Sequence, residues 1–394
     1  MFKNRSLFII GVIAVVNALG YGIIIPILYS YSKHFGMSDF QNGLLFSIFS
    51  LCSFISAPII GRLSDKYGRR PLLITSIAGT AVSFFMAAFA PSALFLFLAR
   101  ALDGITAGNL PVAAAVIADT TEIKDRAKGF GIIGAAFGFG FVFGPAISAF
   151  TVRYGIQVPF IIAGVISVVA VVITAIFLPE TNKHMGQIEH KGKLFDFPLL
   201  ARTLVDEKAG ATLLISLLYM FAFSMAMIYG FQPFSRHVLH MTDTQIALVF
   251  TMFGLVGLIT QVAIIGRLSK FVGIKKLFMT SLATTTMVLF AMSLSRTIPI
   301  FIGVSVLLAL SNSFGNPLIQ TILSKETDAK SQGSILGLNT SYQSIGSIFG
   351  PILGGLLATY YAPLPMMAGG LVLGVCFFIA FKIRLTVQKE HLFN

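Results

Sequence analysis

The sequence predicts an all-α polytopic membrane protein with twelve transmembrane helices, arranged as two six-helix halves, and with both termini in the cytoplasm. Three observations predict this class: very little charge, apolar runs of bilayer length, and a basic phrase that is written twice. Of the 394 residues, 56% are hydrophobic and only 11% are charged, whereas a soluble protein is about a quarter charged. An α-helix rises about 1.5 Å per residue, so about 20 apolar residues cross a hydrocarbon core of about 30 Å.

Twelve apolar runs are separated by charged or turn-rich breaks. In order they are residues 7–29, 43–61, 71–90, 93–118, 129–151, 158–178, 211–232, 244–266, 277–295, 299–323, 333–358 and 364–384. Pro and Gly inside several runs do not argue against them, because neighbouring helices can satisfy the freed backbone groups. The polar stretch 179–210 lies between the sixth and seventh runs. We therefore expect a six-helix bundle at 1–178, a cytoplasmic linker at 179–210 and a second bundle at 211–394.

The basic residues are sorted to one side of these runs. The termini and the even-numbered loops hold 23 of the 28 Lys and Arg, while the odd-numbered loops hold only Lys33, Arg153, Arg236 and Arg296. Because positive loops stay in the cytoplasm, both termini are predicted to be cytoplasmic. The net charge of +13 is then explained by contact with anionic lipid headgroups, and no nucleic-acid partner is expected.

One phrase recurs in the two halves. Residues 61–70 read GRLSDKYGRR and residues 266–275 read GRLSKFVGIK, with matching letters 205 positions apart. A second echo, GFVFGP and GSIFGP, sets Gly144 and Pro145 against Gly350 and Pro351 at an offset of 206. Two echoes in the same order indicate duplication of a six-helix unit. The Gly–Pro pairs are interpreted as a hinge and seal between the halves or, equally, as close packing by small residues.

The first copy of the phrase carries an acid among its bases. Asp65 can accept a charge-assisted hydrogen bond from Arg69 or Arg126, or face a helix N-terminus. Gly61 would let helices approach closely, and Gly68 would permit a tight turn. The simpler alternative is that these bases only anchor the loop on the cytoplasmic side.

Several motifs resemble those of the major facilitator superfamily, and the resemblance covers essentially the whole chain. GRLSDKYGRRPLL is similar to the loop 2–3 signature of that family, and LARALDGITAG to the Arg-containing helix-4 motif of its drug:proton antiporters. GFVFGPAISA resembles their helix-5 motif, with Ser148 and Ala149 where two glycines are usual. GYGIIIPIL and VIADTTEIKDRAKGFG are especially similar to bacterial tetracycline exporters.

This resemblance implies the major facilitator fold in a bacterial cytoplasmic membrane. It also implies that Asp65, Arg69 and Asp119 latch the two halves together while the protein faces outward. The first, fourth, seventh and tenth runs would line a central cavity, which favours Asn17, Tyr21, Asp103, Tyr219, Phe223, Asn312 and Asn316 as lining residues. The sequence departs from the tetracycline exporters at Asn17, where those proteins carry an acid.

Polar residues inside the runs are the candidates for the site. Arg100 and Asp103 are the only ionisable acid–base side chains deep in a run, and their i, i+3 spacing lets them pair. Such groups face the protein interior and are expensive to bury, so we interpret them as proton-coupling residues, with a purely structural pair as the alternative. Polar stripes at helical spacing add further candidates for the cavity lining: Asn17, Tyr21, Asn312, Asn316, Gln320, Asn339 and Gln343. The alternative for these stripes is hydrogen bonding between helices, worth about 0.6 kcal/mol per contact.

The predicted function is transport by alternating access. Proton-coupled export of amphipathic drugs or metabolites is favoured, and an uptake carrier or facilitator for a small metabolite is the alternative. Expected partners are a small-molecule substrate, protons and the lipid bilayer, and the protein is expected to be a monomer. We expect no enzyme, cofactor or metal, because no nucleophile–base set, carboxylate pair or ligand cluster lies at one membrane depth; Cys52 and Cys376 read as small hydrophobes.

Overall fold

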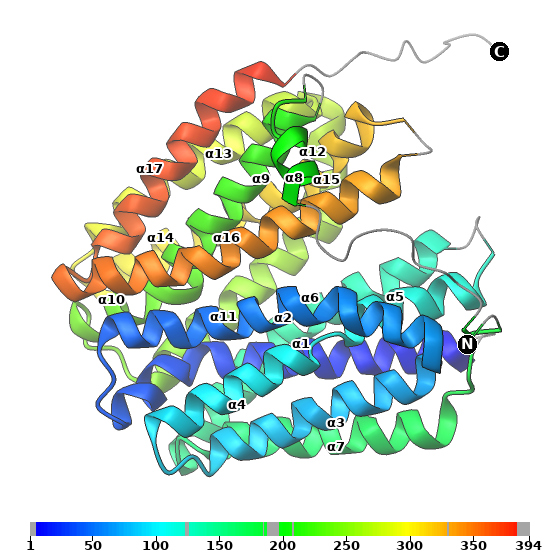
Figure 1. Cartoon of the computed structure of the whole chain (residues 1–394). Helices are drawn as coiled ribbons and strands as arrows, with labels where there is room; N and C mark the ends of the chain where they lie inside the picture. The colour runs from blue at the N-terminus through cyan, green and yellow to red at the C-terminus, as the bar shows by residue number, and fades with distance from the viewer. Residues whose placement is uncertain are drawn as a thin grey trace, which may run out of the picture.

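The computed structural model describes residues 5–122, 126–183, 185–186, 197–206, 209–328 and 331–383, and its regular elements are all helices (Figure 1). The first group comprises α1 (Arg5–His34), α2 (Asp39–Tyr67), α3 (Arg69–Ala88), α4 (Ala93–Thr106), α5 (Asn109–Thr120), α6 (Arg126–Thr151), the short η2 (Val152–Tyr154) and α7 (Val158–Phe177). The short α8 (Phe197–Thr203) follows. The second group comprises α9 (Gly210–Phe223), η3 (Ser224–Gly230), α10 (Phe231–His237), α11 (Asp243–Ile259), η4 (Thr260–Ile264), α12 (Ile265–Val272), α13 (Ile274–Ser293), α14 (Ile298–Asn312), α15 (Gly315–Glu326), α16 (Gln332–Tyr360), α17 (Leu364–Ile379) and η5 (Ala380–Lys382).

All twelve predicted runs lie on these helices. Among the described residues, eleven helical spans are long and apolar enough to cross a membrane. The remaining run, 333–358, is the eleventh in order and lies on α16, which has the length of a span but carries polar residues such as Asn339, Gln343 and Ser347. Its polarity is explained by burial, because Asn339 is only 3% exposed and faces protein rather than lipid.

Two helices, α2 and α11, begin ahead of their apolar runs at capped ends. Ser38 accepts a hydrogen bond from the backbone N–H of Gln41 at 3.2 Å, and Thr242 accepts one from Gln245 at 3.3 Å; both form reciprocal capping boxes. The two caps read MSDFQ and MTDTQ and lie 204 residues apart. They are a third echo of the repeat, which the sequence analysis missed.

The repeated phrase forms the same turn in both halves. Gly68 joins α2 to α3 with φ +104°, and Gly273 joins α12 to α13 with φ +83°. Glycine adopts this region without the steric cost that a Cβ brings, as expected for Gly68. At Gly61, by contrast, an added Cβ would meet no atom within 4 Å, so the expected close helix approach is not found there.

The two groups of helices meet along two pairs, α2 with α16 and α6 with α11. The approach is close enough to require glycine: a Cβ at Gly43 of α2 would overlap the carbonyl oxygen of Pro351, and one at Gly254 of α11 would overlap that of Phe141. Separate buried cores fill each group, one within residues 209–383 and two that draw mainly on residues 9–178. The division of the chain at 179–210 into two bundles remains a prediction.

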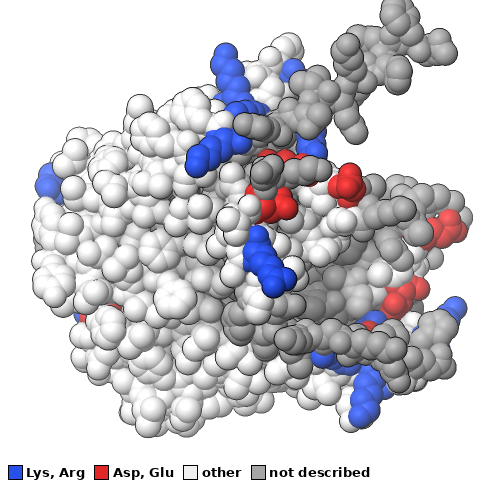
Figure 2. Space-filling model, turned by 45° about the horizontal axis from the view of Figure 1, so that its top comes forward, with Lys and Arg blue, Asp and Glu red and all other residues white. Residues whose placement is uncertain are grey.

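The outer surface is apolar where a bilayer would touch it. Figure 2 shows a broad face almost free of Lys, Arg, Asp and Glu, with the charged side chains gathered toward one side. Large apolar side chains are also exposed on the outside of the molecule, including Val262 at 79% and Phe378 at 71%. Together with the spans, this surface shows an integral membrane protein.

Candidate transport cavity

A cavity of about 620 Å³ lies between the two groups of helices. Side chains of both groups line it, and aromatic rings dominate: Phe46, Phe49, Phe84, Phe137, Phe141, Phe223, Phe250 and Phe253. A volume of this size suits one drug-sized molecule.

Two helix breaks occur beside the cavity. The fourth span is interrupted between Thr106 and Asn109, and the tenth between Asn312 and Gly315. Asn109 and Gly315 lie 206 residues apart, so the breaks are equivalent in the repeat. Broken helices are tolerated at membrane depth where they line a cavity and where polar groups satisfy the freed backbone.

Arg100 and Asp103 line the cavity from α4. Arg100 Nη1 lies 2.7 Å from Asp103 Oδ2, and the two residues are 6% and 7% exposed. The guanidinium also lies over the ring of Phe49, with Cζ 4.5 Å from the ring centroid, a cation–π arrangement. Among the described lining residues these two are the charged ones, as the sequence predicted for the membrane interior.

Asn17 and Tyr21 of α1 line the same side of the cavity. Asn109 donates to Asn17 Oδ1 at 2.6 Å, which fixes the orientation of the Asn17 amide. Asn109 was missed in the sequence, although an Asn beside Gly within an apolar run is a signal that could have identified it.

The second group of helices contributes neutral polar groups. The Tyr219 hydroxyl donates to Asn312 Oδ1 at 2.7 Å, and Gln343 Nε2 donates to Asn316 Oδ1 at 2.8 Å. Tyr219, Phe223, Asn312 and Asn316 line the cavity, so two members of the predicted stripe Asn312, Asn316 and Gln320 lie where the sequence placed them.

Three of the predicted lining residues lie elsewhere. Gln320 is exposed on α15, outside the cavity lining. Asn339 accepts from the Ser216 hydroxyl at 2.5 Å and Gln343 contacts Asn316, so both bond between helices behind the lining. The alternative of interhelical hydrogen bonding describes Asn339 and Gln343 better than cavity lining does.

The lining also contains polar residues that the sequence analysis did not select: Ser50, Ser53, Thr80 and Gln261. Gln261 lies in η4, a π-helical turn of the eighth span, and such turns are frequent at functional sites. A glutamine in an otherwise apolar run was the available signal.

The hydrogen bonds that join the two groups gather at one end of the cavity. We call these residues the cross-half lock: Ile25, Tyr29, Ser30, Asp39, Tyr229, Gln232, Arg236, His237 and Asp243. Buried Gln232 donates to the carbonyl of Ile25 at 2.7 Å and accepts from the backbone N–H of Tyr29 at 3.2 Å. The cavity is therefore tied shut at this end.

Two acids of the lock start equivalent helices. Asp39 begins α2 and accepts from the Tyr29 hydroxyl at 2.6 Å, while Lys33 lies 2.7 Å from it. Asp243 begins α11 and accepts from the Ser30 hydroxyl at 2.5 Å, while Arg236 lies 3.0 Å from it. Each acid also lies in the first turn of its helix, where the macrodipole favours negative charge.

The predicted latch residues cluster at the far end of α2. Arg69 Nη1 lies 2.6 Å from Asp65 Oδ1, and Arg69 Nε lies 3.1 Å from Asp119 Oδ2. Glu180, which the sequence analysis missed, accepts from the backbone N–H groups of Arg69 and Arg70 at 2.9 and 3.0 Å. These contacts lie within the first group of helices. The Arg126 side chain lies outside the described residues.

The Gly–Pro pairs occupy matching places in the two groups. A Cβ at Gly144 would press on Gly22 of α1, and one at Gly350 would overlap the Ser224 hydroxyl of η3. Pro145 and Pro351 line the cavity, and α6 and α16 continue through them. The glycines pack helices closely within each group, while a hinge role for the prolines stays a prediction.

Comparison with known proteins agrees with this architecture. The family model described as Major Facilitator Superfamily matches residues 10–234 and 212–393. Tetracycline resistance protein, class G, of Vibrio anguillarum is 31% identical over 370 residues, which cover 91% of this chain and 91% of that protein. Multidrug resistance protein 2 of Bacillus subtilis (strain 168) is 28% identical over 378 residues, 94% and 93% of the two chains. The crystal structure of a bacterial homolog to the human lysosomal transporter Spinster, inward-facing and unoccupied, aligns with a TM-score of 0.78 at 16% identity over 97% of this chain and 98% of that one.

Proposed function

Because the chain belongs to the Major Facilitator Superfamily, and is thus a membrane transporter rather than an enzyme, we propose that it exports amphipathic drugs or metabolites in exchange for protons. One observation carries this proposal. A drug-sized, aromatic-lined cavity between the two groups of helices holds a single buried ion pair, Arg100 with Asp103. Relatives named as tetracycline and multidrug resistance proteins support it.

The cavity lining favours an amphipathic cargo. Phenylalanine rings supply apolar contact area, and the Asn17, Asn312 and Gln261 amides offer both donors and acceptors. A site with few polar groups among many rings accepts molecules that combine a hydrophobic body with a few hydrogen-bonding groups.

Asp103 is the group we assign to proton coupling. A carboxylate buried in a membrane protein is stable while a guanidinium pairs with it, and costly once that partner leaves. If Arg100 separates from Asp103 as the cavity changes its opening, the carboxylate is better neutralised by a proton. Re-forming the 2.7 Å pair would then release that proton, which couples proton movement to the conformational change.

The direction of opening follows from the predicted orientation. Lys33 and Arg236 are predicted to lie outside the cell, which makes the lock the outer gate and the described conformation one that is closed to the exterior. Export then requires the lock to open while the end near Asp65, Arg69 and Asp119 closes. The contacts that each end makes in only one of the two conformations set the equilibrium between them.

Transport in proteoliposomes, with and without an imposed pH gradient, tests the proposal. We expect the wild type to concentrate an amphipathic substrate against its gradient only when the pH gradient is present. Asp103→Asn should lose this accumulation yet keep downhill flux, whereas Arg100→Ala should impair both because it strands a buried carboxylate.

Asp119→Asn is the matched control, because it removes the charge of another Asp that is paired with an arginine. Because Asp119 belongs to the predicted latch, this substitution should slow transport as Asp65→Asn does, but the pH gradient should still drive accumulation. If Asp103→Asn still concentrates substrate, Asp103 is not the coupling group. If the wild type ignores the pH gradient, the facilitator or uptake carrier replaces the exporter.

A further inference from the structure

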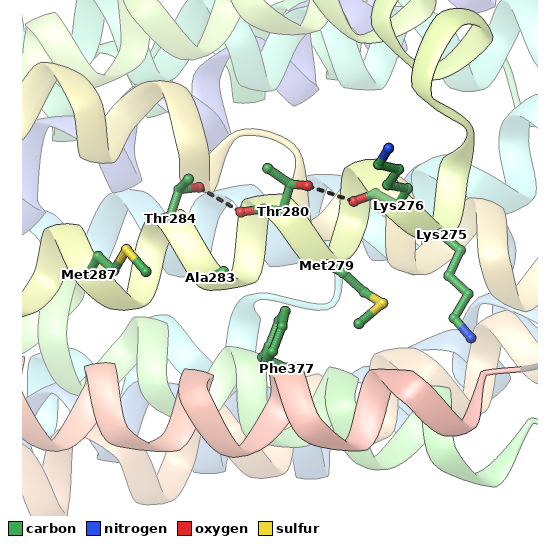
Figure 3. Close-up of a pocket in the computed structure, with 8 residues that line it drawn as sticks. All are labelled: Lys275, Lys276, Met279, Thr280, Ala283, Thr284, Met287 and Phe377. Carbon is green, nitrogen blue, oxygen red and sulfur yellow. Dashed lines mark hydrogen bonds between the residues drawn. The ribbon is translucent and has the colours of Figure 1, made fainter.

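A groove of about 490 Å³ lies on the outer surface of the second group of helices, between α13 and α17 (Figure 3). Its lining is Lys275, Lys276, Met279, Thr280, Ala283, Thr284, Met287 and Phe377. Figure 3 shows the α13 residues following one another along one face of that helix, with Phe377 of α17 opposite. None of these residues lines the transport cavity, so the groove is a separate feature.

Glycine sets where the two helices touch and where they part. A Cβ at Gly370 of α17 would lie 3.1 Å from the Phe290 ring and 3.4 Å from the Thr286 carbonyl oxygen. About two turns later along α17, Phe377 stands across from Met279 and Ala283 with open space between the helices. The groove is therefore sealed at the Gly370 end and runs toward the two lysines.

The lining of the groove is apolar although it includes two threonines. The Thr280 hydroxyl donates to the Lys276 carbonyl at 2.9 Å, and the Thr284 hydroxyl donates to the Thr280 carbonyl at 2.9 Å. Because their own helix satisfies both hydroxyls, the groove receives their methyl groups. Met279 and Met287 add flexible apolar side chains that adapt to a chain of variable shape.

Positive charge gathers at the open end. Lys275 Nζ donates to the carbonyls of Phe381 and Ile383 at 3.0 and 2.7 Å, so the end of α17 holds it in place. Lys276 is exposed beside it, and so is Lys382 of η5. Basic pockets between transmembrane helices on the cytoplasmic side bind the head groups of anionic lipids.

The internal repeat gives an independent reason to expect an anion here. In the first copy, the start of α3 holds a carboxylate, because Glu180 accepts from the backbone of Arg69 and Arg70. In the second copy, no described side chain caps the start of α13 at Gly273. The residue 205 positions after Glu180 is Leu385, so the chain supplies no acid at the equivalent place.

We propose that this groove binds an anionic phospholipid of the cytoplasmic leaflet. One acyl chain lies along α13 against Phe377, and the phosphate lies at the start of α13 beside Lys275 and Lys276. Two features of the groove fit such a lipid. It is apolar along its length and ends in lysines, and it ends at the start of α13, whose counterpart in the first repeat, the start of α3, already holds the carboxylate of Glu180.

The absence of tryptophan from the sequence allows a sharp test. Phe377→Trp places a single reporter in the groove, and Phe378→Trp places one on the adjacent residue, which is 71% exposed and outside the groove lining. The full-length protein is reconstituted in phosphatidylcholine, and brominated phosphatidylglycerol or brominated phosphatidylcholine quenches the reporter. We expect phosphatidylglycerol to be preferred at Phe377→Trp and not at Phe378→Trp.

Second substitutions in the Phe377→Trp protein test separately how the lysine charge and the shape of the groove contribute to the lipid preference. Lys276→Gln should weaken the preference about fivefold, while Lys270→Gln, which removes an exposed lysine of α12 outside the groove, should leave it unchanged. Ala283→Leu fills the groove and should remove the preference although every charge remains. Equal preference at both reporters, or a preference insensitive to Lys276→Gln and Ala283→Leu, overturns the proposal.

The C-terminal acid Glu390, which lies outside the described residues, is the competing occupant within this chain. In the Phe377→Trp protein, Glu390→Gln should leave the preference for phosphatidylglycerol unchanged. If phosphatidylglycerol is preferred only after Glu390→Gln, the chain's own carboxylate fills the site and the lipid proposal is wrong.

Discussion

Ser30→Ala is predicted to open the cross-half lock. The Ser30 hydroxyl makes two hydrogen bonds between the groups of helices. It donates to Asp243 at 2.5 Å and accepts from Arg236 Nε at 3.2 Å. The ion pair of Arg236 with Asp243 lies within the second group and survives the substitution. The change therefore removes contacts made only when this end is closed, without stranding a charge.

Ser30→Ala should shift the equilibrium between the closed and open lock by a moderate amount. A hydrogen bond to a charged group contributes about 1.5–3 kcal/mol, but the Arg236 and Asp243 side chains are 36% and 19% exposed, so water competes for them. We take about 1–2 kcal/mol for the two bonds together, which is a factor of about 5–30 in an equilibrium. The population open at this end should rise by that factor for as long as it is the minor state.

Distances between spin labels at positions 34 and 297 report the opening, in a background without Cys52 and Cys376. Ser30→Ala should increase the long-distance population. Ser32→Ala is the matched control, because the Ser32 hydroxyl donates to the Tyr29 carbonyl at 2.8 Å within the first group of helices. An unchanged distance distribution in folded Ser30→Ala protein, or an equal change in Ser32→Ala, refutes the reasoning.

Three further predictions concern the membrane orientation, the latch and the contact between the two groups of helices. Single cysteines should be labelled from outside intact cells at position 296 and not at position 270, and the opposite result would reverse the predicted orientation. Asp65→Asn should slow transport severalfold at equal expression without preventing insertion, because a partly exposed ion pair is worth under about 1 kcal/mol; an unchanged rate would leave only the anchoring role for that loop. Gly43→Ala should keep the locked end from closing, since its Cβ would overlap backbone of α16, while Gly303→Ala, with no atom within 4 Å of the new Cβ, should not change the spin-label distances.

The sequence predicted the spans and the buried charges well because each rests on a local signal. Hydrophobic length identifies a membrane helix without any knowledge of its neighbours, and an ionisable pair inside such a helix must face protein or water. Arg100 and Asp103 accordingly lie in the cavity. The polar stripes were less informative, because an amide such as Asn339 satisfies the same pattern when it bonds to Ser216 of another helix.

The cross-half lock could not be read from single residues, since its bonds join positions about 200 residues apart. Arg236 counted only as a loop charge, and Asp39 and Asp243 were not singled out, because nothing local indicates which surface each side chain meets. The internal repeat in the sequence does indicate two residues of the lock. The caps MSDFQ and MTDTQ put one acid at the same end of two equivalent helices, and halves related by a pseudo-two-fold axis bring such equivalent ends toward each other. A search for echoes among polar caps, and not only among the basic phrases, would have identified both acids of the cross-half lock.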